Sequence, residues 1–298
     1  MAESLIERHP SYFRRCTREL WHFPDGTPTL SFPSLKDEIE HKDVVYLWDF
    51  SRVETLFDQY NIIFNLVKNS VESLTIFMPY FPVGTSERVE KKGETESAHA
   101  FAHLLSSLPS WLATKNRIHI FDIHALVEQS LFDPERIHAE LHTVTSLLEL
   151  LPDEQIVFPD EGAAKRFRYA FEEYPDRERI ICSKVRTGRE KHITIKEWDP
   201  SGQNVVIVDD LIQSGSTILE TARVLRAAGA KGVRAFAPHG IFPRDAHIGI
   251  AQELDALIVT DSLPMNMIRA ASVSNMQVLT LTPLIEKILC IPTNPSSL

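Results

Sequence analysis

Short apolar runs alternate with longer amphipathic stretches along most of this chain. In the first half, the runs at residues 44–50, 74–77 and 118–122 have the length and the apolar composition of buried strands. Apolar side chains recur at helical spacing over residues 56–67, and a second helix is predicted at about residues 95–108. Strands that alternate with helices in this way predict an α/β fold with a mainly parallel sheet flanked by helices.

The same alternation restarts after Pro152. It predicts strands at residues 156–158, 180–182 and 205–208, and the last of these is β-branched throughout, as in a strand buried on both faces of a parallel sheet. A helical pattern follows from Ile218, and Gly229 stands where that helix would end. Two series of β/α units of similar size indicate an internal duplication.

Length and charge narrow the classes of function. The 298 residues suffice for one large or two medium domains, and the net charge of −10 argues against partners such as nucleic acid or an anionic membrane. Cys16, Cys182 and Cys290 lie far apart, so neither a zinc site nor a disulfide framework is indicated. The chain has no apolar run of membrane length and no signal-peptide core at its start, so we expect a cytoplasmic protein.

The loop after the strand at residues 205–208 carries the clearest chemistry. It contains an acidic pair followed by small or polar residues: Asp209, Asp210, Gln213, Ser214, Gly215, Ser216 and Thr217. Small residues let the N–H groups of a helix start point at a phosphate, and carboxylates accept hydrogen bonds from sugar hydroxyls. Together they describe a site for a ribose 5-phosphate group. The alternative is an ordinary strand-to-helix turn with one capping residue; a nucleotide P-loop would need a Lys at the end of the loop.

Two further polar segments follow predicted strands. Asp122 and His124, two residues apart in an extended chain, are either magnesium ligands or ordinary packed and capping residues. Four basic residues at positions 184–191 predict either a solvated loop or a mobile loop that neutralises phosphate charge. The residues alone leave both pairs of alternatives open.

The loop at residues 205–217 resembles the loop that binds phosphoribosyl diphosphate (PRPP) in type I phosphoribosyltransferases and in PRPP synthetases. Four other segments occur in PRPP-synthetase order: FPDG at 23–26, PYFP at 79–82, DIHALVEQSLFD at 122–133 and FPDEGAAKRF at 158–167. On these motifs the chain is identified as a member of the ribose-phosphate pyrophosphokinases. FPVGTSER, KVRTGR and VDDLIQSGST make it most similar to the plant-type, class II synthetases.

The resemblance implies two duplicated phosphoribosyltransferase-like domains, at residues 1–137 and 138–298, in a homo-oligomer. It implies transfer of a diphosphate group to ribose 5-phosphate from ATP or another nucleoside triphosphate, with Mg2+ as cofactor. Asp209, Asp210 and the five residues at 213–217 would bind ribose 5-phosphate, and Lys184 and Arg186 would be catalytic. Mg2+ would be held by His124 and Asp160, supported by Asp122 and Asp133. ATP would contact Phe23, Asp25, Gly26, Thr85, Ser86 and Arg88.

The chain departs from the family pattern in two places. Thr85 and Ser86 replace an Arg-Gln pair that contacts the donor nucleotide, so we expect relaxed selection for adenine. The part before Phe23 is short and lacks an apolar first strand, so we expect a truncated start or a first domain without an edge strand. Three rival readings remain: a PRPP-consuming phosphoribosyltransferase, an inactive PRPP-synthetase-associated regulatory subunit, and a ribose-phosphate binding protein without turnover.

Overall fold

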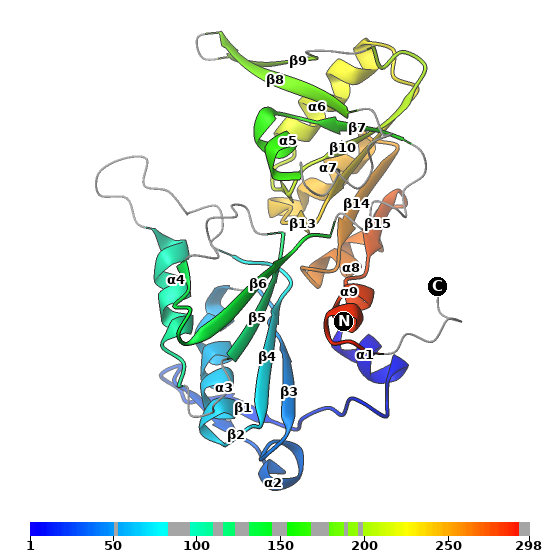
Figure 1. Cartoon of the computed structure of the whole chain (residues 1–298). Coiled ribbons are helices and arrows are strands. Elements are labelled where there is room, and N and C mark those ends of the chain that lie inside the picture. The colour runs from blue at the N-terminus through cyan, green and yellow to red at the C-terminus, as the bar shows by residue number, and fades with distance from the viewer. Residues whose placement is uncertain are drawn as a thin grey trace. The chain divides into compact units, whose positions relative to one another are not determined.

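The structure is a computed structural model, and the chain divides into two compact units. Unit 1 comprises Met1–His142 with Thr282–Leu298, and unit 2 comprises Thr143–Leu281 (Figure 1). The described residues are 1–50, 53–82, 96–109, 116–122, 131–144, 154–167, 179–187, 190–195 and 199–291; at 179, 184–187 and 190–192 the description covers the backbone alone. The expected boundary after residue 137 thus lies five residues earlier than the observed one, and the C-terminal segment joins unit 1.

Unit 1 is built on a four-stranded parallel sheet with the order β3-β4-β5-β6. Its elements are α1 (Ala2–Arg8), β1 (Glu19–His22), β2 (Pro28–Ser31), α2 (Leu35–Glu38), β3 (Asp43–Leu47), η1 (Val53–Thr55), α3 (Leu56–Lys68), β4 (Ser73–Met78), α4 (Ser97–Ser106), β5 (Asn116–Phe121), β6 (Ile137–His142) and α9 (Thr282–Ile288). β1 and β2 form a separate antiparallel hairpin.

The two faces of this sheet differ in chemistry. Ile118 and Ile120 of β5 belong to a core that also contains Ile62 and Ile63 of α3. Because successive side chains of a strand point to opposite faces, His119 lies on the other face. There it stacks on Phe77 of β4, with 4.9 Å between ring centroids. A buried histidine is thus placed on the face away from the α3 core.

Unit 2 is built on a seven-stranded sheet with the order β15-β14-β12-β10-β7-β8-β9, parallel throughout except for the β8–β9 pair. Its elements are β7 (Gln155–Phe158), α5 (Glu161–Phe167), β8 (Arg179–Thr187), β9 (Glu190–Ile195), β10 (Asn204–Val208), β11 (Leu211–Ile212), α6 (Ser216–Ala227), β12 (Gly232–Ala237), β13 (His239–Gly240), η5 (Pro243–Asp245), α7 (Ala246–Gln252), β14 (Ala256–Thr260), α8 (Met265–Ala270) and β15 (Met276–Leu279). Helices flank mainly parallel strands in each unit, which confirms the predicted α/β fold class.

Three segments differ from the sequence-based expectation. Residues 21–30, for which the apolar pattern predicts no strand, belong to the β1–β2 hairpin. β6 was not expected, although its residues alternate between apolar and polar, which is the pattern of a half-buried strand. The expected basic loop is wrong at residues 184–187: they continue β8, and Lys184 pairs with Ile193 and Arg186 with Lys191 of β9. Antiparallel backbone hydrogen bonds with β9 extend β8 through a segment whose basic residues had predicted a loop. Within the described residues, no helix is long and apolar enough to cross a membrane.

Candidate active site

The predicted ribose-phosphate loop lies at the carboxyl end of β10, in the middle of the unit 2 sheet. From β7 the chain moves outward to β8 and β9, then returns to place β10 on the opposite side of β7. Open α/β sheets bind ligands at such a reversal, outside the carboxyl ends of the two strands. Asp160 follows β7, and Asp209 follows β10. The topology therefore brings two of the predicted site segments to one place.

The backbone of the loop is held by a neighbouring segment. Leu211 and Ile212 of β11 pair in parallel with His239 and Gly240 of β13. The N–H of His239 donates to the carbonyl of Asp210 at 3.2 Å, and the N–H of Ile241 donates to the carbonyl of Ile212 at 2.9 Å. These bonds fix the path of the chain between the acidic pair and the start of α6.

Gly215 is required at the point where the loop turns into α6. Its φ is +74°, in the left-handed region that side chains with a Cβ disfavour. A Cβ built there would lie 2.3 Å from Cδ1 of Ile250 in α7. The N–H of Leu219 donates to the Gly215 carbonyl at 2.9 Å, so the helix begins at once. Glycine therefore allows both the turn and the close approach of α7.

The start of α6 presents polar groups to the solvent. Gln213, Ser214 and Ser216 are exposed, whereas Thr217 is half-buried. The Ser214 hydroxyl donates to the Ser216 hydroxyl at 3.4 Å, and among the described residues no side chain caps this 12-residue helix. The first backbone N–H groups of a helix have no partner within the helix and carry partial positive charge. This end of α6 is thus suited to an anion such as a phosphate.

The two carboxylates of the acidic pair repel one another. The backbone N–H of Asp210 donates to Oδ1 of Asp209 at 3.0 Å, which orients the Asp209 carboxyl group. Burial raises the pKa of Asp209 well above its usual value, and the charges of Asp210 and Asp160 raise that pKa further. Hydrogen-bond donors or a cation would stabilise these carboxylates. The site can therefore hold sugar hydroxyls, a cation, or both.

Arg166 is a site residue that sequence reasoning did not single out. Its guanidinium forms an ion pair with Asp210 and lies 3.9 Å from Oδ1 of Asp209. α5 carries it to the acidic pair, because β7 and β10 are neighbours in the sheet. The available signal was its place eight residues after Phe158, in the same segment as Asp160. Arg166 is the observed counter-charge of the acidic pair.

Asp160 starts α5 and contributes a carboxylate to the same region. Its Oδ1 accepts the N–H of Ala163 at 3.0 Å, and its carbonyl accepts the N–H of Ala164 at 3.2 Å. Its charge acts on Asp209, so the two carboxylates lie within electrostatic range. Carboxylate oxygens are the hard ligands that Mg2+ prefers. The chemistry of this donor set fits the predicted Mg2+.

Comparison with known proteins gives the same family. A family described as the phosphoribosyl synthetase-associated domain matches residues 180–294. Ribose-phosphate pyrophosphokinase 4 of Arabidopsis thaliana is 34% identical over 272 residues, which cover 87% of this chain and 80% of that protein. The chloroplastic ribose-phosphate pyrophosphokinase 3 of Oryza sativa subsp. japonica is 37% identical over 90% of this chain and 68% of its own length. The chain belongs to the ribose-phosphate pyrophosphokinase family.

The fold of the family extends over almost the whole chain. Phosphoribosylpyrophosphate synthetase from Mycobacterium smegmatis matches 97% of this chain and 94% of its own, with a TM-score of 0.79 and 22% identity. At that identity the likeness shows the fold. The chain spans 62% of the length of the chloroplastic pyrophosphokinase 3 of Arabidopsis thaliana.

In unit 1, the predicted nucleotide motif forms the tip of the β1–β2 hairpin. Gly26 has a φ of +85°, and its N–H donates to the carbonyl of Phe23 at 2.8 Å. Oδ1 of Asp25 accepts the N–H of Thr27 at 2.9 Å, and this hydrogen bond lowers the pKa of Asp25. The Phe23 side chain is 53% exposed. An exposed aromatic ring on a fixed turn is a suitable surface for a nucleotide base.

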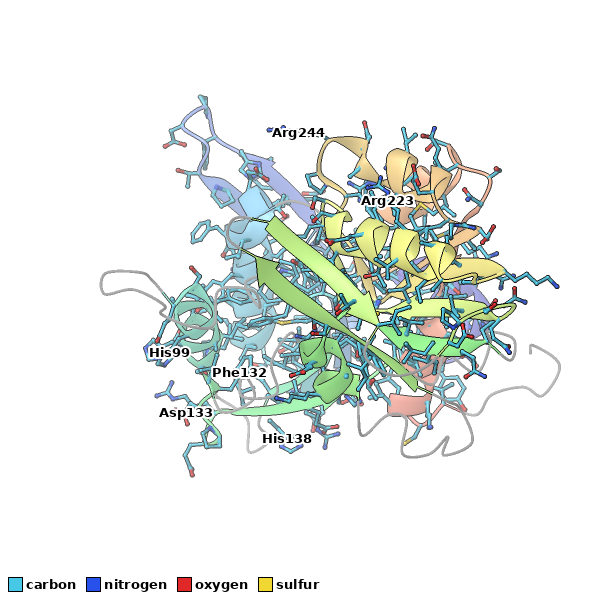
Figure 2. All side chains as sticks on the ribbon, turned by 90° about the horizontal axis from the view of Figure 1, so that it is seen from above. His99, Phe132, Asp133, His138, Arg223 and Arg244 are labelled. Carbon is cyan, nitrogen blue, oxygen red and sulfur yellow. The ribbon has the colours of Figure 1, made fainter. Side chains whose placement is uncertain are left out.

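Asp122 and Asp133, the two supporting acids of the predicted magnesium site, make different local hydrogen bonds. Asp122 follows β5 with a φ of +41°, and its N–H donates to the carbonyl of His142 at 2.8 Å. Asp133 lies next to Phe132, and its N–H donates to the hydroxyl of Ser106 in α4 at 3.0 Å (Figure 2). Its Oδ1 accepts the N–H of Glu135, and its Oδ2 lies 3.6 Å from Nε of Arg136. Asp133 thus stabilises the turn before β6, whereas Asp122 directly follows β5.

The remaining predicted residues lie partly or wholly outside the described structure. His124, Thr85, Ser86 and Arg88 lie outside the described residues. Lys184 and Arg186 lie on β8, with their backbone described and their register against β9 known. Their roles stay predictions.

Proposed function

We propose that this protein is a ribose-phosphate diphosphokinase, which makes PRPP from ribose 5-phosphate and ATP or another nucleoside triphosphate. The observation that carries the proposal is the loop after β10. It combines the half-buried Asp209 and the buried Asp210 with a helix start that no described side chain caps, at the reversal point of the sheet. Membership of the ribose-phosphate pyrophosphokinase family supports the same reading. A PRPP-consuming transferase or a regulatory subunit has no such support from the relatives.

The loop would bind the acceptor at both of its ends. The carboxylates of Asp209 and Asp210 accept hydrogen bonds from the ribose hydroxyls. The 5-phosphate occupies the start of α6, where backbone N–H groups and the hydroxyls of Ser214, Ser216 and Thr217 donate to its oxygens. Arg166 offsets the charge of Asp210 and orients that carboxylate when no substrate is bound. These contacts fix the anomeric hydroxyl in one direction.

The proposed reaction needs no covalent bond between the protein and the substrates. The anomeric oxygen forms a bond to the β-phosphorus of the donor, and the bond from that phosphorus to the α–β bridging oxygen breaks. The nucleoside monophosphate leaves with that electron pair, and the hydroxyl proton is released to solvent. Lys184 and Arg186 neutralise the charge that builds up on the transferring oxygens.

The proposed reaction includes Mg2+, for which the chain supplies carboxylate and imidazole ligands. His124 and Asp160 would hold it, with Asp122 and Asp133 in support, and when bound it would neutralise charge on the phosphates. On the donor side, Phe23, Asp25 and Gly26 would bind the base. Thr85, Ser86 and Arg88 would contact the triphosphate.

The proposal is tested by an assay that couples AMP formation to ribose 5-phosphate. The wild-type chain should form AMP from ATP only when ribose 5-phosphate and Mg2+ are both present. Lys184→Ala should lose turnover and keep ribose 5-phosphate binding in a calorimetric titration, because the side chain acts on the transition state. Lys231→Ala, at an exposed position of the same unit, is the matched control and should keep full activity.

Two outcomes would contradict these assignments. If the folded wild-type protein binds ribose 5-phosphate and forms no AMP, it is a regulatory subunit or a binding protein. If Lys184→Ala loses binding and keeps turnover, the catalytic role of Lys184 is wrong. Asp210→Ala should instead weaken ribose 5-phosphate binding.

A further inference from the structure

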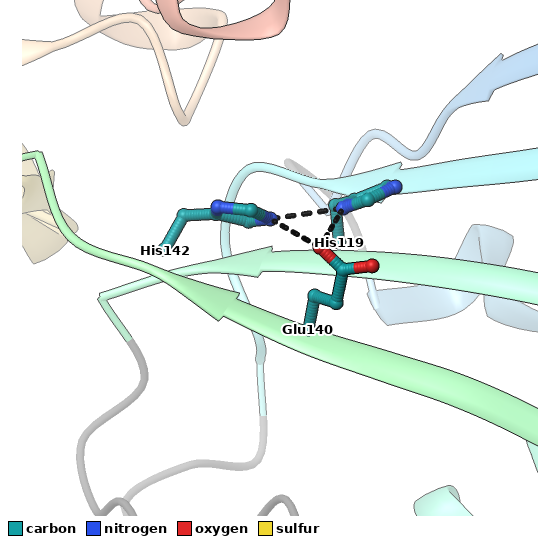
Figure 3. A group of neighbouring side chains, drawn as sticks. All are labelled: His119, Glu140 and His142. Atoms are coloured by element: carbon teal, nitrogen blue, oxygen red, sulfur yellow. Dashed lines mark hydrogen bonds and ion pairs between the residues drawn. The ribbon is translucent and has the colours of Figure 1, made fainter. Parts of the chain in front are cut away.

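Unit 1 contains a cluster of two histidines and a glutamate that the reaction does not use. It consists of His119 on β5 and Glu140 and His142 on β6 (Figure 3). Nδ1 of His119 lies 2.8 Å from Nε2 of His142 and 3.6 Å from Oε2 of Glu140. Nε2 of His142 lies 3.9 Å from the same carboxylate oxygen. Three potential ligand atoms thus converge from two adjacent strands.

The strands themselves bring these side chains together. His119 and Glu140 are direct partners in the parallel register of β5 and β6, so they lie on the same face of the sheet. Residues at alternate positions of a strand share a face, so His142 lies beside Glu140 on that face. Aromatic rings support both imidazoles: Phe77 stacks on His119, and Phe121 lies 5.5 Å from the ring of His142. The arrangement is fixed by the sheet.

A further histidine holds the glutamate in place. Nε2 of His138 lies 3.0 Å from Oε1 of Glu140, which leaves Oε2 directed at the other two histidines. His138 itself is exposed and projects from the start of β6 (Figure 2). Metal-binding side chains in proteins are commonly oriented by such outer hydrogen bonds.

We propose that His119, Glu140 and His142 bind one divalent transition-metal ion of the zinc type, through Nδ1, Oε2 and Nε2 respectively. In a tetrahedral zinc site, bonds of 2.0–2.2 Å place the ligand atoms roughly 3.4 Å apart. The observed separations bracket this value, and the two imidazole nitrogens need to move apart by roughly half an ångström. A water molecule would complete the coordination. Two imidazole ligands favour zinc, cobalt or nickel over Mg2+.

The surroundings of the two imidazoles suit this role. The His119 side chain is buried, and that of His142 is half-buried beside it. The neutral imidazole is the form that binds a metal. Without a metal, one ring donates its N–H to the other. The bound ion would replace that hydrogen bond and join the carboxyl ends of β5 and β6.

The test uses the full chain and Co2+, whose visible absorption reports its coordination. In excess Mg2+, Co2+ should bind at one equivalent with the intense absorption bands of a tetrahedral site. X-ray absorption of the Zn2+-loaded protein should show two imidazoles and oxygen ligands. Glu140→Gln and His142→Gln should each weaken Co2+ and Zn2+ binding by at least about a hundredfold. His138→Gln, which loosens the carboxylate, should weaken it by about tenfold.

A second His–Glu pair in unit 1 provides the matched control. Nδ1 of His99 lies 3.4 Å from Oε2 of Glu96 on the exposed side of α4, so the variant Glu96→Gln/His99→Gln should keep full metal affinity. Thermal unfolding of each variant without metal checks that it folds; Glu140 is 40% exposed, so its substitution leaves the core intact. The proposal is overturned if the wild-type chain gives no tetrahedral absorption. It is also overturned if folded Glu140→Gln binds Co2+ as tightly as the control variant.

Discussion

At the scale of single residues, Arg166 decides how the acidic pair is held. Two carboxylates side by side repel one another, and the pKa of Asp209 is already raised by its surroundings. The guanidinium of Arg166 offsets this repulsion at Asp210 and, at 3.9 Å, at Asp209. Both the charge and the orientation of the pair therefore depend on this contact.

Replacing Arg166 should weaken the binding of the acceptor sugar. Arg166→Gln removes the counter-charge and about one charged hydrogen bond, a loss of about 1.5–3 kcal/mol. We therefore expect the KM for ribose 5-phosphate to rise at least about tenfold, as measured by steady-state kinetics. Lys165→Gln, an exposed neighbour on the same helix, is the control and should leave the KM unchanged. Equal KM values for the two variants would show that Arg166 does not position the acidic pair.

The steric cost of a Cβ at Gly215 can be separated from the cost of its backbone conformation. Gly202 has the same φ of +74°, and a Cβ there would meet no atom within 4 Å. Gly202→Ala should cost about 1–2 kcal/mol of unfolding free energy, from backbone conformation alone. Gly215→Ala should cost about 1–3 kcal/mol more, because its Cβ meets Ile250. Urea unfolding measures both variants.

A rescue experiment separates the two causes at Gly215. Adding Ile250→Ala to Gly215→Ala removes the clashing atoms, so the double variant should lose less stability than the sum of the two single losses. Strict additivity would mean that Ile250 does not restrict position 215.

At the scale of elements, the sequence predicts some parts and leaves others to tertiary contacts. The β10–loop–α6 unit is predictable, because four β-branched residues precede the loop and a helical pattern follows it. β6 lacks such a continuous apolar run; its alternation of apolar and polar residues is the weaker pattern of a half-buried strand. Strand β8 continues past Lys184 because β9 pairs with it. The contact of Arg166 with the acidic pair depends on the order of strands, which no local pattern encodes.

β8 also gives a prediction about cysteine reactivity. Cys182 is fully buried on this strand, and burial raises its pKa to about 11, whereas Cys290 is exposed. The thiolate is the reactive form, so iodoacetamide at pH 8 should modify Cys290 in the native protein and leave Cys182 intact. Mass spectrometry of the peptides measures both sites. Modification of Cys182 at the rate of Cys290 would mean that β8 opens in the native state.

At the scale of the whole molecule, the C-terminal helix α9 belongs to unit 1. Glu286 of α9 is fully buried, and its carboxylate meets Nε of Arg8 and Nε2 of His9, each at 2.9 Å. These groups come from α1 and the residue after it, so the first and last helices, α1 and α9, lie side by side (Figure 1). No sequence pattern predicts a pair separated by 278 residues.

Removing the buried carboxylate of Glu286 should destabilise unit 1. Glu286→Gln weakens the charged contacts with Arg8 and His9 and should cost about 1.5–3 kcal/mol of unfolding free energy. Glu3→Gln is the control. Glu3 also lies on α1, and its ion pair with Arg15 is exposed, so this substitution should cost less than about 1 kcal/mol. Chemical denaturation measures both, and similar small losses would show that α9 is not anchored through Glu286.

A ribose-phosphate diphosphokinase transfers a diphosphate group from ATP to ribose 5-phosphate. The most direct measurement is 31P NMR of the purified protein with ATP, ribose 5-phosphate and Mg2+. Resonances of AMP and of a diphosphate attached to the anomeric carbon should grow together in a one-to-one ratio. Formation of ADP, or no change in the ATP resonances from a folded protein that binds ribose 5-phosphate, would show that the protein does not transfer a diphosphate group.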